Sequence, residues 1–189
     1  MYTDSERDDK MEDQDKRLER FQSGPPVEIV GTLLNSIDNF YNHQEIDQAA
    51  TNELWLLVIL GIHSVALTIT EGVFGKRGEG GFRFFLENFV DENEEGANFS
   101  AIAAEIHNMR NVIAHQWLSS SLYGFALDTT INKGWEMRDG ILHFNPQRYY
   151  EAYSRAFADR GRIWSYDRLL SKQEYQQAKD RLLKKYTAR

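Results

Sequence analysis

The sequence predicts an all-α protein, a helical bundle of four to six helices with a small β-hairpin insertion near residues 122–144. Apolar residues recur at three- and four-residue spacing in several segments, which is typical of helices that bury one face. The three prolines stand at positions 25, 26 and 146, so long helices are permitted between them. The 189 residues include 4 Trp, 9 Tyr and 11 Phe, enough apolar bulk for a packed core. We therefore expect a single domain over residues 25–189.

The first 24 residues differ from the rest of the chain. They contain eight acidic and five basic residues but only scattered apolar ones, which predicts a charged, flexible N-terminal arm. Pro25-Pro26 then favours the start of the first helix, because proline is well tolerated in a first helical turn. Its buried face is predicted from residues at helical spacing: Val27, Val30, Leu34, Ile37 and Tyr41. Asn42-His43 is expected to end this helix.

The segment from about 47 to 74 is predicted to be the central helix, because it is apolar on most faces. Its uninterrupted apolar run, Leu54 to Leu60, is far shorter than a membrane span of about 18 residues. His63 and Glu71 lie in its continuation, so no membrane span is expected. The glycine-rich stretch 75–81 follows a helix and lacks a Gly-Lys-Ser/Thr ending. We therefore interpret it as a connector, not a phosphate-binding loop.

Two further helices are expected before the β-prone region. Residues 82–89 carry phenylalanine and leucine at helical spacing, and residues 100–119 form a longer amphipathic segment. Residues 122–144 contain short β-prone runs separated by glycine-containing turns, which predicts a small hairpin or three-strand excursion.

The C-terminal part is predicted to return to helix. Asn145-Pro146 combines a good cap with a first-turn proline, so a helix should begin there. Ser171 and Glu174 have the spacing of a capping box that opens a last basic helix. Residues 146–189 are therefore expected to form the C-terminal helices.

Charge and cysteine content exclude several classes of protein. The absence of Cys excludes a disulfide scaffold, a thiolate zinc site and a cysteine nucleophile. The acidic N-terminus lacks the features of a secretion signal, so a cytoplasmic location is expected. Residues 160–189 contain nine basic and three acidic residues, against 13 and 26 in the rest of the chain. The acidic majority argues against a broad nucleic-acid-coating surface. The basic segment is either a local phosphate contact or a solvated helix face.

The helix predicted over 100–119 combines a core stripe with a polar flank. At 100° per residue the stripe falls within an arc of about 80°, and it consists of Ile102, Ile106, Met109, Ile113 and Trp117. The polar flank lies beside it, and alanines are interspersed. It consists of His107, Arg110, Asn111 and His115. Small alanine side chains on this side favour a closely packed neighbour.

Three interpretations compete for the polar flank. His107 and His115 are about 12 Å apart along the helix axis, too far to bind one ion, so no metal is expected. A structural role would have Arg110 and His115 capping or salt-bridging neighbouring helices. The third is catalysis on a phosphodiester, because arginine offers a fork of donors to phosphate oxygens and histidine can accept or donate a proton.

The run Arg110-Asn111-Val112-Ile113-Ala114-His115 resembles the signature of the HEPN superfamily, in which an arginine and a polar residue precede a histidine on a late helix. The helix order agrees with that family over roughly residues 27–121. The resemblance implies an up-and-down bundle and a homodimer that brings two copies of the motif together. It also implies metal-independent RNA cleavage in active members, with no cofactor.

The resemblance implies a separate role for each residue of the motif. Arg110 would stabilise charge developing on the phosphate oxygens, and His115 would be the general acid/base. Asn111 would orient His115 or a phosphate. His107 has no counterpart in the motif, so His107 and Trp117 are expected to support the site or to lie at the interface. Attack by the RNA 2′-hydroxyl would leave a cyclic phosphate, so DNA would not be cut.

The resemblance leaves two functions open. One is an endoribonuclease that acts on RNA as a toxin with an antitoxin partner, or as a defence effector. Trp117 stands where the toxin branch usually has a modifiable tyrosine, so regulation by modification there is not expected. The other is a non-catalytic interaction or nucleotide-sensing module that keeps the same helical fold.

Overall fold

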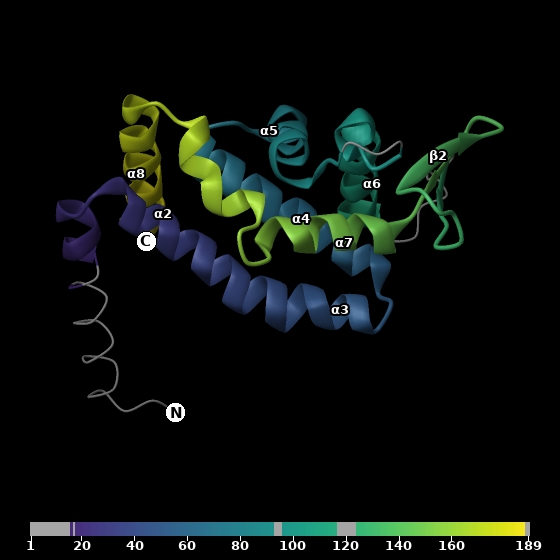
Figure 1. The fold of residues 1–189 in the computed structure, drawn as a ribbon, viewed down its shortest axis with the longest axis horizontal. Helices are drawn as coiled ribbons and strands as arrows, with labels where there is room; N and C mark the ends of the chain where they lie inside the picture. The colour runs from purple at the N-terminus through teal and green to yellow at the C-terminus, as the bar shows by residue number, and fades with distance from the viewer. Residues whose placement is uncertain (1–15, 17, 93–95, 117–123, 188–189) are drawn as a thin grey trace.

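A computed structural model describes residues 16, 18–92, 96–116 and 124–187. The described chain is mainly helical with one small three-stranded sheet, so the predicted all-α class is confirmed in its coarser form, a mainly helical protein (Figure 1). Most of the expected arm lies outside these residues. Its last part, residues 18–23, is helical, and Phe21 is buried in the core.

The first long helical stretch runs without a break from residue 26 to residue 51. It comprises α2 (Pro26–Ser36), the π-helix η1 (Ile37–Ile46) and α3 (Asp47–Thr51). The predicted end at Asn42-His43 is therefore wrong. Asn42 is buried, and its side-chain oxygen accepts a hydrogen bond from the Tyr153 hydroxyl at 2.6 Å. A polar residue that finds a partner inside the protein does not have to end a helix.

The central helix is shorter at its start than the sequence predicts. Residues 52–54 are not helical and interrupt the predicted helix. The helix α4 (Trp55–Ile69) follows them and continues into the π-helical turn η2 (Thr70–Phe74). Gly75 ends it with a left-handed φ of 68°. The span Trp55–Phe74 is long and apolar enough to cross a membrane by length and composition, and 56% of its 18-residue apolar window is buried inside the protein.

Two shorter helical stretches pack beside α4. The first is α5 (Gly78–Phe85) with η3 (Leu86–Val90), which begins four residues earlier than residue 82. The second is the 3₁₀ turn η4 (Phe99–Ile102) followed by α6 (Ala103–Gln116). Both α5 and α6 contact α4, and they also contact each other.

Three short strands follow α6 in the sequence and form one sheet. Its strands are β1 (Phe125–Leu127), β2 (Trp135–Arg138) and β3 (Ile141–Phe144), in the spatial order β1-β3-β2. β1 pairs with β3 in parallel, and β2 pairs with β3 in antiparallel fashion. Asp139 and Gly140 connect β2 to β3, both with positive φ, as a tight two-residue turn requires.

Three helical elements complete the chain: α7 (Pro146–Phe157), η5 (Arg162–Leu169) and α8 (Lys172–Thr187). The side-chain oxygen of Asn145 accepts hydrogen bonds from two backbone N–H groups of α7, which confirms the predicted cap. Ser171 and Glu174 exchange reciprocal side-chain to backbone bonds, which confirms the capping box. The helix α8 packs against α2 and η2.

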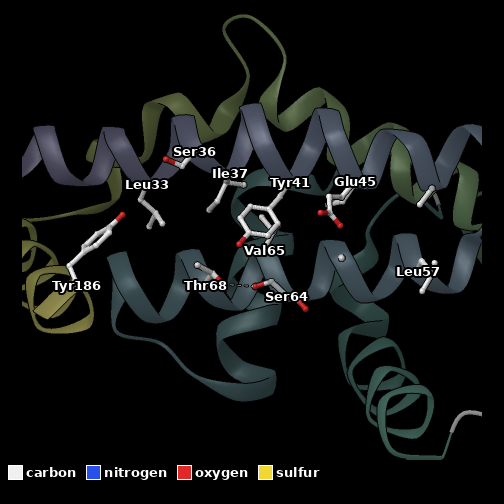
Figure 2. Close-up of a pocket in the computed structure, with 13 residues that line it drawn as sticks. Leu33, Ser36, Ile37, Tyr41, Glu45, Leu57, Ser64, Val65, Thr68 and Tyr186 are labelled. Carbon is white, nitrogen blue, oxygen red and sulfur yellow. Dashed lines mark hydrogen bonds between the residues drawn. The ribbon is translucent and has the colours of Figure 1, made fainter. Parts of the chain in front are cut away.

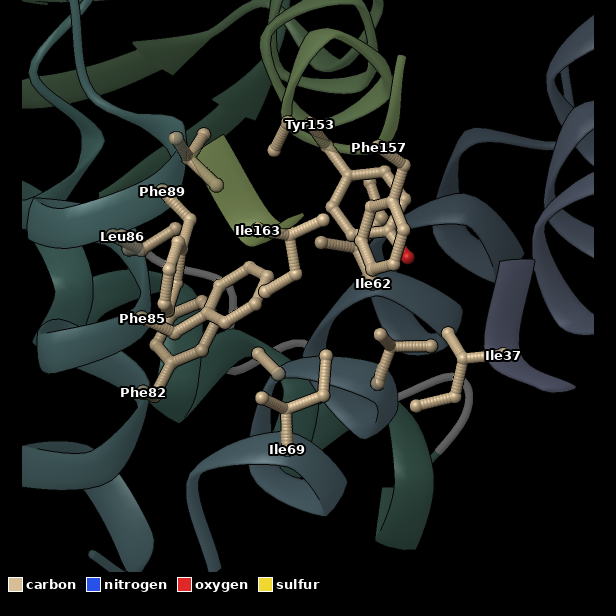
Figure 3. Packing of buried hydrophobic residues seen from close by; sticks show 14 of the residues in the cluster. Ile37, Ile62, Ile69, Phe82, Phe85, Leu86, Phe89, Tyr153, Phe157 and Ile163 are labelled. Atoms are coloured by element: carbon tan, nitrogen blue, oxygen red, sulfur yellow. The ribbon is translucent and has the colours of Figure 1, made fainter. Parts of the chain in front are cut away.

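The core centres on α4, as the sequence predicts. Figure 3 shows aromatic side chains of α5, η3 and α7 meeting isoleucines of α4 and η1. The Phe85 ring lies 5.4 Å from that of Phe89 and 6.3 Å from that of Tyr153, between centroids. The second of these contacts joins α5 to α7, and both helices also pack against the central helix α4.

Candidate functional site

The polar flank of α6 lies beside the stripe of apolar residues that this segment buries in the core. The described members of the stripe, Ile102, Ile106 and Met109, are all buried, as predicted. The side chain of Ile113 and the whole of Trp117 lie outside the described residues. His107, Arg110 and Asn111 are partly buried beside the stripe, so the polar flank borders the contact of α6 with α4 and α5.

Arg110 and Asn111 interact directly. Nη1 of Arg110 donates a hydrogen bond to Oδ1 of Asn111 at 2.9 Å. Nε of Arg110 is buried and has no hydrogen-bond partner. Within the described parts of the chain, Arg110 forms no ion pair with a carboxylate. The guanidinium is therefore held by its own helix and is not neutralised by a neighbouring one.

His115 lies in α6, one turn after Asn111. Its side chain lies outside the described residues, so only its place on the helix is given. Residues four apart on a helix are surface neighbours, which puts positions 111 and 115 on one side of α6.

His107 is paired with a second histidine, which was not among the predicted site residues. Nε2 of His63, in α4, lies 2.9 Å from Nδ1 of His107. His63 is fully buried, and the centroid of its ring lies 4.5 Å from that of Phe82 in α5. The two histidines therefore join α4 to α6 by a polar contact beside the aromatic core.

The protonation of this pair follows from its surroundings. Burial is the largest cause that lowers the pKa of His63, and together with the charges of His107 and Arg110 it brings this pKa to about 3. Burial also lowers the pKa of His107; the carboxylate of Glu79 opposes this effect, and Arg110 adds to it. Nδ1 of His63 is buried without a partner. Since a buried unpartnered N–H is rarer than a buried lone pair, we infer that His63 carries its proton on Nε2 and donates it to His107.

This arrangement predicts a pH-dependent stability. The folded state holds His63 neutral to about pH 3, whereas the unfolded chain protonates it below about 6.5. The stabilisation is complete above pH 6.5, and it is lost by up to about 1.4 kcal/mol per pH unit as the pH falls. We expect His63→Gln to lack this slope, because glutamine can donate the same bond without titrating. Urea unfolding of both proteins between pH 7 and pH 5 measures the difference, and parallel curves would contradict the assignment.

The two histidines of this pair are also potential metal ligands. No group of three or more His, Asp or Glu side chains that could hold an ion exists among the described residues. Nε2 of His63 and Nδ1 of His107 face each other and are used in their mutual hydrogen bond. The pair therefore positions α6 and does not present two free nitrogens to one ion.

The signal that could have identified His63 is its place in the sequence. It is the one ionisable residue of the segment Ile59 to Ile69, which is apolar apart from Ser64 and Thr68. A histidine in a buried helix needs a polar partner from another element. The sequence does not say which element supplies it, because the partner is 44 residues away.

Comparison with known proteins adds no relative: no protein family, no curated protein and no solved structure matches this chain.

Proposed function

We propose that this protein is a HEPN-like, metal-independent endoribonuclease that acts as a homodimer. The observation that supports this most is the state of Arg110. Its side chain is held by Asn111 and lacks a carboxylate partner among the described residues. An arginine in a purely structural role would be expected to pair with an acid on a neighbouring helix, whereas an unneutralised guanidinium is suited to a phosphate.

In the proposed reaction the 2′-hydroxyl of RNA attacks the adjacent phosphorus. The bond from 2′-oxygen to phosphorus forms, the bond from phosphorus to 5′-oxygen breaks, and the products are a 2′,3′-cyclic phosphate and a 5′-hydroxyl. His115 accepts the proton of the 2′-hydroxyl, and a protonated His115 of the second copy supplies one to the leaving oxygen. Arg110 stabilises the charge on the non-bridging oxygens, while Asn111 orients its guanidinium.

The finer features of the fold belong to the same proposal. Residues 25–189 form one HEPN-like domain, an up-and-down bundle with the hairpin insertion of residues 122–144 after the motif helix. The dimer joins two motif helices, and the protein acts in the cytoplasm as a toxin with an antitoxin partner or as a defence effector. His107, fixed by His63, supports the motif from the preceding turn of α6.

One observation favours a second candidate, a non-catalytic interaction or nucleotide-sensing module. Outside residues 160–189 the chain has 26 acidic and 13 basic residues. Such a charge repels a long polyanion, whereas a small nucleotide needs only a local arginine. Under this alternative Arg110 binds a nucleotide phosphate and no bond is broken.

Cleavage of matched RNA and DNA oligonucleotides in excess chelator separates the two candidates. We expect the protein to cut the RNA and to leave the DNA of the same sequence intact, because DNA lacks the attacking hydroxyl. Intact RNA at concentrations where the dimer is established by sedimentation would support the binding module. Cleavage of both strands would contradict attack by the 2′-hydroxyl.

A further inference from the structure

A large groove lies between the first helical stretch and the central helix. Its volume is about 660 Å³, and its walls are α2, η1 and α3 on one side and α4 on the other. Figure 2 shows Ile37 and Tyr41 extending from the upper helix towards Val65 on α4, with Tyr186 of α8 at one end. The groove has no lining residue from α6, so it is separate from the Arg110 motif.

The π-helix η1 builds one wall of this groove. Ten consecutive residues, Ile37–Ile46, adopt this conformation, which normally occurs as a single turn and frequently marks a functional site. It places Ile37, Tyr41, Glu45 and Ile46 along the groove. Opposite Ile46, α4 has Gly61, where an added Cβ would lie 3.0 Å from Cγ1 of Ile46. Glycine thus lets the two walls meet at this point.

The groove is apolar at its surface as well as at its base. Tyr41 is 57% exposed, Tyr186 is 50% exposed and Leu57 is 45% exposed, although all three line the groove. Leu54, three residues before Leu57, is exposed as well. Apolar side chains grouped in this way are typical of an interface with a macromolecule.

The charged residues of the two helical stretches that form the groove are all acidic, leaving histidine aside. Residues 26–74 contain six acidic residues and neither lysine nor arginine; the acids are Glu28, Asp38, Glu45, Asp47, Glu53 and Glu71. Among these acids Glu45 is the one that lines the groove, and it has no hydrogen bond or ion pair with another described residue. A ligand that fills the groove therefore gains from positive charge at its edge.

We propose that this groove binds a basic amphipathic α-helix of a partner protein. The apolar face of that helix would pack on Ile37 and Val65, and a lysine or arginine at its edge would pair with Glu45. The exposed ring of Tyr41 would add a cation–π contact to the same charge. From Leu57 to Thr68 the groove follows α4 for about 16 Å, the length of about three helical turns. This is the geometry of helix-in-groove recognition.

Two occupants from the chain itself fit less well. Residues 1–15 contain seven acidic and two basic residues, so their net charge has the same sign as Glu45 in the groove. The basic helix α8 uses its own apolar residues, Ala178 and Leu182, in the core against α2 and η2. A second copy could therefore offer the apolar face of its α8 only if that helix left its place.

The test is fluorescence anisotropy with a labelled helical peptide of about 14 residues, with leucine at positions i, i+3, i+4 and i+7 and lysine on both flanks. We expect Glu45→Lys to weaken binding about tenfold or more, because it turns an attraction into a repulsion. We expect Ser64→Trp to abolish binding, because Ser64 lines the groove and is exposed, so the indole fills the space. Glu87→Lys, an equal charge change at an exposed position of η3, should leave the affinity within about twofold.

Three results would overturn the proposal. The first is equal binding of a peptide in which glutamate replaces every lysine. The second is no binding of the lysine peptide at about 100 µM. The third is a sedimentation coefficient of the protein alone that falls in Ser64→Trp, which would make the groove a contact between two copies. Thermal melting of each variant verifies that it is folded, and none of these results depends on ribonuclease activity.

Discussion

Replacing Arg110 with alanine is expected to lower the rate of RNA cleavage about 100- to 1,000-fold, the usual cost of losing one donor that stabilises a transition-state oxyanion. His115→Ala is expected to lower it about 100- to 10,000-fold, as for a general acid/base. Both proteins should stay folded. Arg110 lies beside the core stripe, it has no ion pair among the described residues, and alanine is the best helix former.

Matched substitutions separate loss of chemistry from loss of charge. Arg148→Ala removes an exposed arginine of α7 that pairs with Glu151, and His43→Ala removes an exposed histidine that pairs with Asp47. Both should cleave RNA at the wild-type rate. Initial rates on one labelled RNA, with a melting curve for each protein, give the comparison. A lowered melting temperature in Arg110→Ala that accounts for its lost activity would favour the structural interpretation of the motif.

Phe82→Ala is expected to cost about 3 to 5 kcal/mol in the free energy of unfolding. Phe82 is fully buried, and it packs against the ring of His63 at 4.5 Å between centroids. Alanine would leave a cavity between α4, α5 and α6 and would remove an aromatic neighbour from the buried histidine. Since a domain of this size is stable by about 5 to 15 kcal/mol, this loss is a large share of the total.

Phe40→Ala is the control for this change, because Phe40 is 59% exposed on η1. We expect it to change the free energy of unfolding by no more than about 0.5 kcal/mol. Chemical denaturation of the three proteins at pH 7 measures both values. Equal losses at Phe82 and Phe40 would mean that the packing of α5 on α4 and α6 is not as described.

Much of the helical structure could be predicted because its causes are local. Spacing of apolar residues identified the central helix and the buried stripe of α6, and the caps at Asn145 and Ser171 were visible as short motifs. The end of the first helix was mispredicted for a non-local reason. Asn42 has the residue type of a helix end, but it bonds to Tyr153, 111 residues away, and stays in the middle of a helical stretch.

The candidate site, too, could be predicted from the sequence only where its contacts are local. Arg110 and Asn111 are neighbours in sequence, so the sequence could place them together on one flank of α6. The role expected for Asn111, to orient His115 or a phosphate, differs from its described contact with Arg110. The pairing of His63 with His107 depends on how α4 packs against α6, and no spacing rule within one helix reveals it.

The most direct test of the proposed ribonuclease is the chemistry of its product ends. A defined RNA is incubated with the purified protein in excess chelator, beside His115→Ala, and the fragments are weighed by mass spectrometry. We expect fragments that end in a 2′,3′-cyclic phosphate and begin with a 5′-hydroxyl, formed by the wild type alone. Fragments with 3′-hydroxyl and 5′-phosphate ends, or cleavage that persists in His115→Ala, would contradict it.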